Sequence, residues 1–470
     1  MSGTASLQLV VDRQDEKLRH CIKAIYVGLM AFCLLSFLWT LLIGSGVDNM
    51  PPIIWYARMA TVPLAIYLGK LWKNTGFRIL TVYTAIFFLR CFIPDQNSIF
   101  AEEVAENIIS ALWLFSACYG MGYILNEKQL KKFLLICAGI WTAGMTVLSC
   151  MGIYTAWTEQ TIRLFGKAEI YVYINARVNI IYLATITGSM VGITILMASL
   201  SVICVKNKLV KSLFGIALIP LSIALALTDS RTAYISVPVG LGIIAFSLTF
   251  QFFKNKEKAH GRKRNWKPWI IGILIALVVF ALLVCVLLQI TPIFNQIRNR
   301  GFLISTAYAE EADSTGIVTR GFGGSDILTG RTDLWGKIFD HFKQNPIALL
   351  IGESKLSPLH IVNNYKAHCH SIFIQVLLES GIPGLLLFLA FIGYTLIHAI
   401  RVIRDSDQSL WIRLLPAIPV SLWVGDLAEN FTWLRSSQCP MPAILCITAG
   451  ILCAQASGRK NTKASALESN

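Results

Sequence analysis

Charged residues are scarce in this chain, and their scarcity excludes most soluble architectures. Only 14% of its 470 residues are Asp, Glu, Lys or Arg, whereas 55% are hydrophobic. Soluble domains normally carry about 25% charged residues. The chain contains long apolar runs, and its mean hydropathy is positive. The composition therefore predicts a polytopic membrane protein.

The chain also lacks the N-terminal pattern of a cleavable signal peptide. Charges of both signs continue as far as Lys23, and the apolar run at residues 24–43 is long enough to span a bilayer. We expect this run to remain as the first membrane helix. The net charge of +15 does not indicate nucleic-acid binding, because the basic residues lie mostly in short segments between apolar runs.

Apolar stretches of roughly 17 to 25 residues, the length that crosses a bilayer, recur along the chain. There are twelve of them, at residues 22–43, 52–69, 77–94, 105–125, 131–155, 178–204, 209–228, 232–253, 268–293, 383–400, 410–425 and 440–456. The predicted fold class is an all-α polytopic membrane protein with about 12 transmembrane helices.

The charges of the connections predict the orientation of these helices. "NEKQLKK", "VKNKLVK" and "KNKEKAHGRKRNWK" are basic, whereas "GSGVDNMPP" and "PDQNSIFAEE" contain no Lys or Arg. Basic segments remain on the cytoplasmic side, so both termini should be cytoplasmic. The predicted organisation is a cytoplasmic segment (1–21), spans 1–9 (22–293), a long extracytoplasmic loop with short amphipathic helices (294–382), spans 10–12 (383–456) and a cytoplasmic tail (457–470).

Some outer connections carry basic residues against this pattern. "TEQTIRLFGKAEIYVYINARVN" contains Arg163 and Arg177, and the turn "LALTDSRTAYIS" places Arg231 between two helices almost without a loop. A guanidinium offers a planar fork of donors that suits a diphosphate. The structural alternatives are that long loops cross the membrane whatever their charge, and that Asp229 pairs with Arg231 to cap the turn.

The longest loop contains the segment "GRTDLWGKIFDHFKQNP", whose apolar residues recur at helical spacing. These apolar residues are Leu334, Trp335, Ile338, Phe339 and Phe342. At about 100° per residue, Arg331 projects toward the apolar side of this predicted helix. An anion shared by Arg331 and the amides of the helix N-terminus would give that charge a partner.

A histidine comes before the next apolar span. "HSIFIQVLLES" predicts a short helix at residues 370–380 with His370 leading its apolar face, and "GIPG" breaks that helix. An imidazole is well suited to proton transfer near neutral pH, while a satisfied structural histidine is the alternative. The pattern "HCH", which includes His368, is a weak zinc signal, so no metal site is predicted. Cys369 and Cys439 should lie outside, and we expect no essential disulfide.

Taken in order, these motifs resemble those of the O-antigen ligase and O-antigen polymerase superfamily. The resemblance lies in "SRTA", in "GRTDLWGKIFDHFKQNPIALLIGES" and in "HSIFIQVLLESGIPG", with "RLFGKAEIYVYINARVN" similar to the segment before the sixth span of that family. Two positions depart from the family pattern. Ser371 stands where Asn usually follows the histidine, and Thr232 stands where Gly is common.

The resemblance implies a metal-independent, inverting glycosyltransferase of the cytoplasmic (inner) membrane that needs no cofactor. Its donor would be a glycan linked to undecaprenyl diphosphate, and its acceptor a glycan, lipid or cell-wall component. By motif, Arg231 and Arg331 would hold the diphosphate with Arg163 and Arg177 assisting. His370 would take the proton of the acceptor hydroxyl.

Two further functions remain open at the level of the sequence. A polymerase of the same superfamily would join lipid-linked repeat units, and we place the ligase first because the "SR", "GR" and His370 set matches that branch best. A transporter of polysaccharide or anions should show internal repeats and charges at the membrane midplane. The sequence shows no convincing repeat, and its notable polar residues gather at the predicted outer face.

Overall fold

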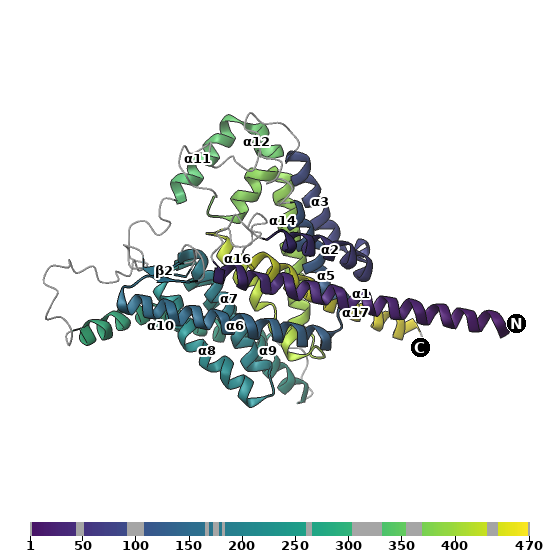
Figure 1. Ribbon diagram of the computed structural model, residues 1–470, viewed down its shortest axis with the longest axis horizontal. Helices are drawn as coiled ribbons and strands as arrows, with labels where there is room; N and C mark the ends of the chain where they lie inside the picture. Colours follow the sequence, from purple (N-terminus) through teal and green to yellow (C-terminus); the bar gives the residue numbers. More distant parts are fainter. Residues whose placement is uncertain are drawn as a thin grey trace.

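The structure is a computed structural model, and it describes the chain in ten stretches. These are residues 2–43, 51–91, 108–164, 169–172, 178–180, 184–259, 266–302, 331–353, 369–429 and 440–468. Figure 1 shows a bundle of long helices with a small sheet on one side. In Figure 1 the N-terminal end of α1 and the C-terminal end of α17 lie on the same side of the molecule.

Helices account for most of the described residues. They are α1 (Ser2–Ile43), α2 (Pro52–Gly69), α3 (Thr75–Cys91), α5 (Tyr119–Ile124), α6 (Glu127–Thr158), α7 (Ala184–Cys204), α8 (Lys208–Leu227), α9 (Arg231–Ala259), α10 (Lys267–Phe302), α11 (Arg331–Gln344), α12 (Pro346–Ile351), α14 (Ile372–Arg404), α15 (Leu410–Leu414), α16 (Ala417–Asp426) and α17 (Met441–Glu468). A 3₁₀ turn at Leu71–Lys73 and a π-helical turn at Trp113–Cys118 complete the set.

Seven helical segments within the described residues are long and apolar enough to cross a membrane. They are Asp15–Trp39, Glu127–Thr158, Thr185–Cys204, Lys208–Leu227, Arg231–Glu257, Lys267–Ile297 and Ile372–Arg404, with shorter apolar helices at Thr75–Leu89, Ile108–Ile124 and Met441–Ser457. The prediction of a helical, multi-pass membrane protein is confirmed. The number of twelve spans and the cytoplasmic position of the termini stay predictions.

The expectation of an all-α chain is wrong at one point. Strands β1 (Ile162–Arg163), β2 (Glu169–Val172) and β3 (Val178–Ile180) form an antiparallel sheet in the order β1-β2-β3. The sixth span therefore does not begin at residue 178, because α7 starts at Ala184. Alternating apolar and polar residues favour the strands, and Val178 and Ile180 pack where α6 has only the small Gly152.

A second, smaller core lies apart from the main bundle. It is formed by α11, α12, Cys369 and the first part of α14, and Figure 1 shows α11 and α12 together beyond α14 and α3. Its buried residues are Leu334, Ile338, Phe342, Ala348, Cys369, Leu377 and Leu378. This packing ties residues 331–353 of the long predicted loop to the membrane helix that follows it.

The predicted break at "GIPG" is confirmed as a kink inside α14. Gly381 has a φ of 64° and is non-helical, and Gly352, at the end of α12, has a φ of 78°. A Cβ on Gly352 would lie 2.6 Å from the carbonyl carbon of Glu379, and one on Gly381 would collide with the Leu350 carbonyl. Both positions need glycine, since α12 meets α14 backbone to backbone here.

Candidate active site

The turn between α8 and α9 fixes the first residue of α9, Arg231. Asp229 in this turn has a φ of 45°, a left-handed conformation that Asp tolerates better than most residues. The Tyr234 hydroxyl donates to the Ala226 carbonyl at 2.5 Å across the turn. Gly188 of α7 allows close approach, because a Cβ there would lie 2.5 Å from Cβ of Ser230. The turn is therefore rigid and buried.

Helix α16 runs antiparallel to α9 and brings its C-terminal end toward Arg231. The Ser421 hydroxyl of α16 donates to the Ser236 carbonyl of α9 at 2.6 Å. Asp426 lies five residues after Ser421 on α16, and Arg231 lies five residues before Ser236 on α9. Because the two helices are antiparallel, Asp426 and Arg231 lie at the same level. Glu429 follows three residues later, after the end of α16.

Helix α11 positions the second predicted arginine. Leu334, Ile338 and Phe342 are buried at a spacing of four residues, which confirms the predicted amphipathic helix. Phe339 departs from the prediction, since it is 45% exposed and lies outside the buried stripe. The side chain of Arg331, the first residue of α11, is only 12% exposed, so it does point toward the buried side.

His370 lies in front of α14 rather than inside it, which corrects the predicted helix at residues 370–380. The helix begins at Ile372, and His370 has a φ of 52°. Side chains hold the peptide before it: the Trp335 indole donates to the Cys369 carbonyl at 2.8 Å, and the Cys369 amide donates to Oε1 of Gln375 at 2.9 Å. These bonds stabilise the unusual backbone conformation of His370.

A buried carboxylate connects the arginine and the histidine. Glu429 forms an ion pair through Oε1 with Nη2 of Arg331, and its Oε2 lies 3.1 Å from Nδ1 of His370. The side chain of Glu429 is 4% exposed and that of His370 is 25% exposed. The histidine therefore faces the accessible side of the cluster, and the carboxylate lies behind it.

The contact with Glu429 determines which nitrogen of the neutral His370 ring carries the hydrogen. An ionised carboxylate only accepts hydrogen bonds, so the His370 Nδ1 that faces Glu429 carries the hydrogen. In the neutral ring the other nitrogen, Nε2, is then the acceptor. The arrangement gives His370 the form that a general base requires.

The other residues singled out in the sequence lie apart from this cluster or outside the described residues. Arg163 lies on β1 with its side chain 82% exposed, and its Nε is 2.9 Å from Oε1 of Glu169. Its predicted part in donor binding stays a prediction. Arg177, His368 and Cys439 lie outside the described residues. Cys369 is a buried free cysteine, and burial raises the pKa of its thiol above the ordinary value.

Residues 216–389 match the O-antigen ligase family. This stretch of the chain is similar to the O-antigen ligase family. This match confirms the resemblance to the O-antigen ligase and polymerase superfamily, and it supports a glycosyltransferase-like enzyme of polysaccharide biosynthesis. No curated protein matches the chain.

The matched stretch contains Arg231, Arg331 and His370, but it ends before Glu429. Sequence reasoning missed Glu429, which belongs to no motif that the resemblance supplied. The available signal was weak: "WVGDLAEN" places acidic residues where an apolar span ends near the predicted outer face. The basic residues that this acid meets, Arg331 and His370, are seen only in the structure.

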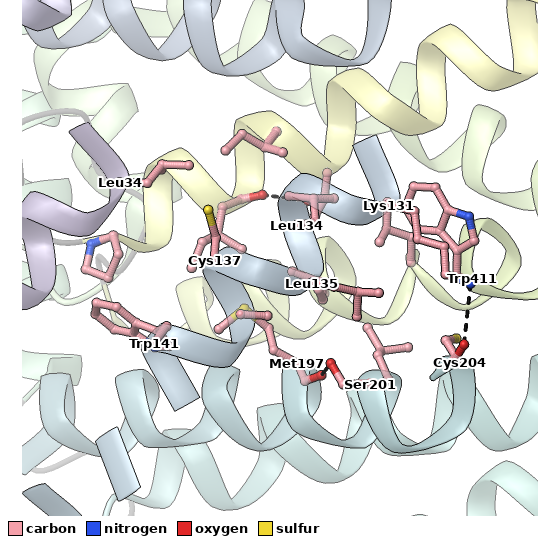
Figure 2. Close-up of a pocket in the computed structure, with 18 of the residues that line it drawn as sticks. Leu34, Lys131, Leu134, Leu135, Cys137, Trp141, Met197, Ser201, Cys204 and Trp411 are labelled. Carbon is pink, nitrogen blue, oxygen red and sulfur yellow. Dashed lines mark hydrogen bonds between the residues drawn. The ribbon is translucent and has the colours of Figure 1, made fainter. Parts of the chain in front are cut away.

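A separate cavity of about 140 Å³ lies within the helix bundle, away from the polar cluster. Figure 2 shows Leu34 and Trp141 toward one end and Lys131 and Trp411 toward the other. The Lys131 amine donates to the Cys204 carbonyl at 3.4 Å. Nearly all of the lining is apolar, so this cavity suits hydrocarbon rather than a sugar. The polar cluster, rather than this cavity, is therefore the candidate active site.

Proposed function

We propose that this chain is an O-antigen ligase-like glycosyltransferase. It moves a glycan from undecaprenyl diphosphate to an acceptor hydroxyl at the outer face of the cytoplasmic membrane. The observation that carries the proposal is the meeting of Arg331 and His370 at one carboxylate, since these two residues come from different elements and are the ones that the motifs single out. The match to the O-antigen ligase family supports the same chemistry.

The reaction is a single displacement at the anomeric carbon. The acceptor hydroxyl attacks that carbon and forms a new C–O bond while its proton passes to Nε2 of His370. The bond from the anomeric carbon to the diphosphate oxygen breaks, and undecaprenyl diphosphate leaves with the electron pair. Attack from the opposite face inverts the anomeric centre. One base and one cationic clamp suffice for this displacement, so it requires neither a metal nor a covalent enzyme intermediate.

Arginines favour this displacement because the leaving diphosphate gains negative charge in the transition state. Arg331 and Arg231 would stabilise that charge more than the charge of the bound donor, which is what lowers the barrier. Arg231 is the first residue of α9, whose N-terminus adds a partial positive charge. The exposed Arg163 would act only in the early capture of the donor.

The test of this function is the conservative replacement of each clamp residue. Arg231→Lys and Arg331→Lys keep the charge but remove the guanidinium fork, so each should lower glycan transfer by about 10²-fold. The measurement is transfer from an undecaprenyl-diphosphate-linked glycan by purified protein in lipid vesicles, with chelator present. Arg401→Lys, at the opposite end of α14, is the matched control and should keep most activity. Near-normal turnover in both clamp variants would contradict the proposal.

The same assay separates a ligase from a polymerase through its acceptor. Transfer to a lipid or cell-wall acceptor, with no growth of the lipid-linked glycan alone, is the expected result. Elongation of the lipid-linked glycan in the absence of any other acceptor would indicate a polymerase instead. Both enzymes would use the same donor chemistry, so both outcomes retain the roles of Arg231, Arg331 and His370.

A further inference from the structure

We infer that Glu429 has two opposed effects at this site, which rest on the proposed function. It positions His370 as the base, and its charge weakens the hold of Arg331 on the diphosphate. Glu429 is thus a positioning residue that raises turnover and lowers affinity for the donor and for the undecaprenyl diphosphate product.

The first effect follows from the hydrogen bond to the imidazole. Oε2 of Glu429 lies 3.1 Å from Nδ1 of His370, and Ser371 offers no amide side chain to take over this role. A carboxylate at Nδ1 holds the ring in one orientation and stabilises the imidazolium that forms when Nε2 takes a proton. Without the carboxylate, the ring would lose both its tautomer preference and the charge that balances the bound proton.

The second effect follows from the ion pair on the other oxygen. Oε1 of Glu429 pairs with Nη2 of Arg331, and this guanidinium is the one assigned to the diphosphate. The carboxylate is almost fully buried, so its charge is poorly screened by solvent. A diphosphate at Arg331 must therefore either displace Glu429 or lie beside a like charge, and both cost affinity.

Weak binding of the diphosphate benefits an enzyme whose product retains that group. Undecaprenyl diphosphate remains after transfer and carries the same anion as the donor. Contacts that bind donor and product equally tightly do not speed the reaction, and they slow the departure of the product. Renewed pairing of Glu429 with Arg331 would favour release.

The test compares Glu429→Gln with the parent chain in two measurements on the full-length protein in lipid nanodiscs. Equilibrium binding of undecaprenyl diphosphate should become tighter by at least about tenfold, because the opposing charge is gone. Turnover at saturating donor should fall by about 10- to 100-fold, a part of what a general base contributes. A gain in affinity also shows that the variant is folded.

The matched control is Glu353→Gln. Glu353 pairs through Oε1 with Nε2 of His341, a histidine of α11, but lies outside the cluster. This variant should change neither the affinity for undecaprenyl diphosphate nor the turnover appreciably. The control separates a general effect of losing a histidine–carboxylate pair from the specific effect at the site.

Each outcome for Glu429→Gln bears on a different part of the inference. Slower turnover with unchanged or weaker binding would overturn the opposition between Glu429 and the diphosphate. Normal turnover would overturn the positioning of His370. If the parent chain transfers no glycan from undecaprenyl diphosphate, the proposed function itself fails, and the inference falls with it.

Discussion

At the scale of single residues, the site depends on how His370 is held before any substrate arrives. Its backbone is fixed by the bonds that Trp335 and Gln375 make to Cys369, and its ring is fixed by Glu429. In the family pattern an Asn follows the histidine, and here Ser371 takes that position with its side chain buried at the start of α14. In the proposed mechanism, the contact with Glu429 orients the His370 ring.

Replacing His370 tests the role of the base directly. His370→Ala should lower turnover by about 10² to 10⁴, the usual contribution of a general base, because it removes the proposed acceptor of the proton. Binding of undecaprenyl diphosphate should change little, since the arginines remain. Turnover at saturating donor and equilibrium binding measure the two effects separately. His341→Ala, which removes a histidine of α11 that pairs with Glu353, is the control and should retain most activity.

The residues of the site differ in how far the sequence alone could identify them. Arg331 follows from a helical pattern of apolar residues around it, and His370 from its position before an apolar helix, so both are local signals. Glu429 lies 98 residues from Arg331 and 59 residues from His370, and it meets them only through the packing of α16. No local pattern encodes such a contact, which is why it required the structure.

At the scale of elements, the contact between α12 and α14 joins α11 and α12 to the helix bundle. Gly352 and Gly381 meet without side chains between them, and the Glu353 amide donates to the Leu378 carbonyl at 2.5 Å. This contact fixes α11 relative to the residue that precedes α14. The distance between Arg331 and His370 therefore depends on two glycines that touch neither of them.

Gly381→Ala should loosen this contact. The new methyl group would collide with the Leu350 carbonyl, and alanine would have to adopt a φ of 64°, so we expect a loss of about 1 to 3 kcal/mol. Thermal unfolding in lipid should show a lower midpoint, and glycan transfer should fall with it. Gly393→Ala lies in the same helix with no atom within 4 Å of the new Cβ, so this control should leave the midpoint unchanged. An unaltered midpoint for Gly381→Ala would disprove the role of this contact.

The helices and strands also differ in how far the sequence alone predicts them. Long apolar runs predict helices such as α8 and α9 to within a few residues, because burial in lipid leaves the backbone no other partner than itself. The strand Val178–Ile180 was missed because it adjoins the apolar run of α7 and shares its hydropathy. Its pairing with β2 depends on residues earlier in the chain, and hydropathy does not detect such pairing.

At the scale of the whole molecule, every proposed role requires the polar cluster to lie on the outer side of the membrane. Lys337 on α11 and Lys206 between α7 and α8 are both exposed, and the predicted topology places them on opposite sides. A cysteine at position 337 should react with a membrane-impermeant maleimide in intact spheroplasts, whereas one at position 206 should react only after lysis. Because Cys21, Cys150 and Cys285 are also exposed, labelling is measured as the increase over the parent chain.

The opposite labelling pattern would invert the topology, with consequences for the function. Arg331, His370 and Glu429 would then face the cytoplasm, where a transfer reaction at the outer face is impossible. The basic segments "NEKQLKK" and "VKNKLVK" would lie outside, against the charge distribution that orients membrane proteins. Reaction at position 337 alone in intact spheroplasts is the result we expect, because the basic cytoplasmic segments and the outer position of the polar cluster require the same orientation.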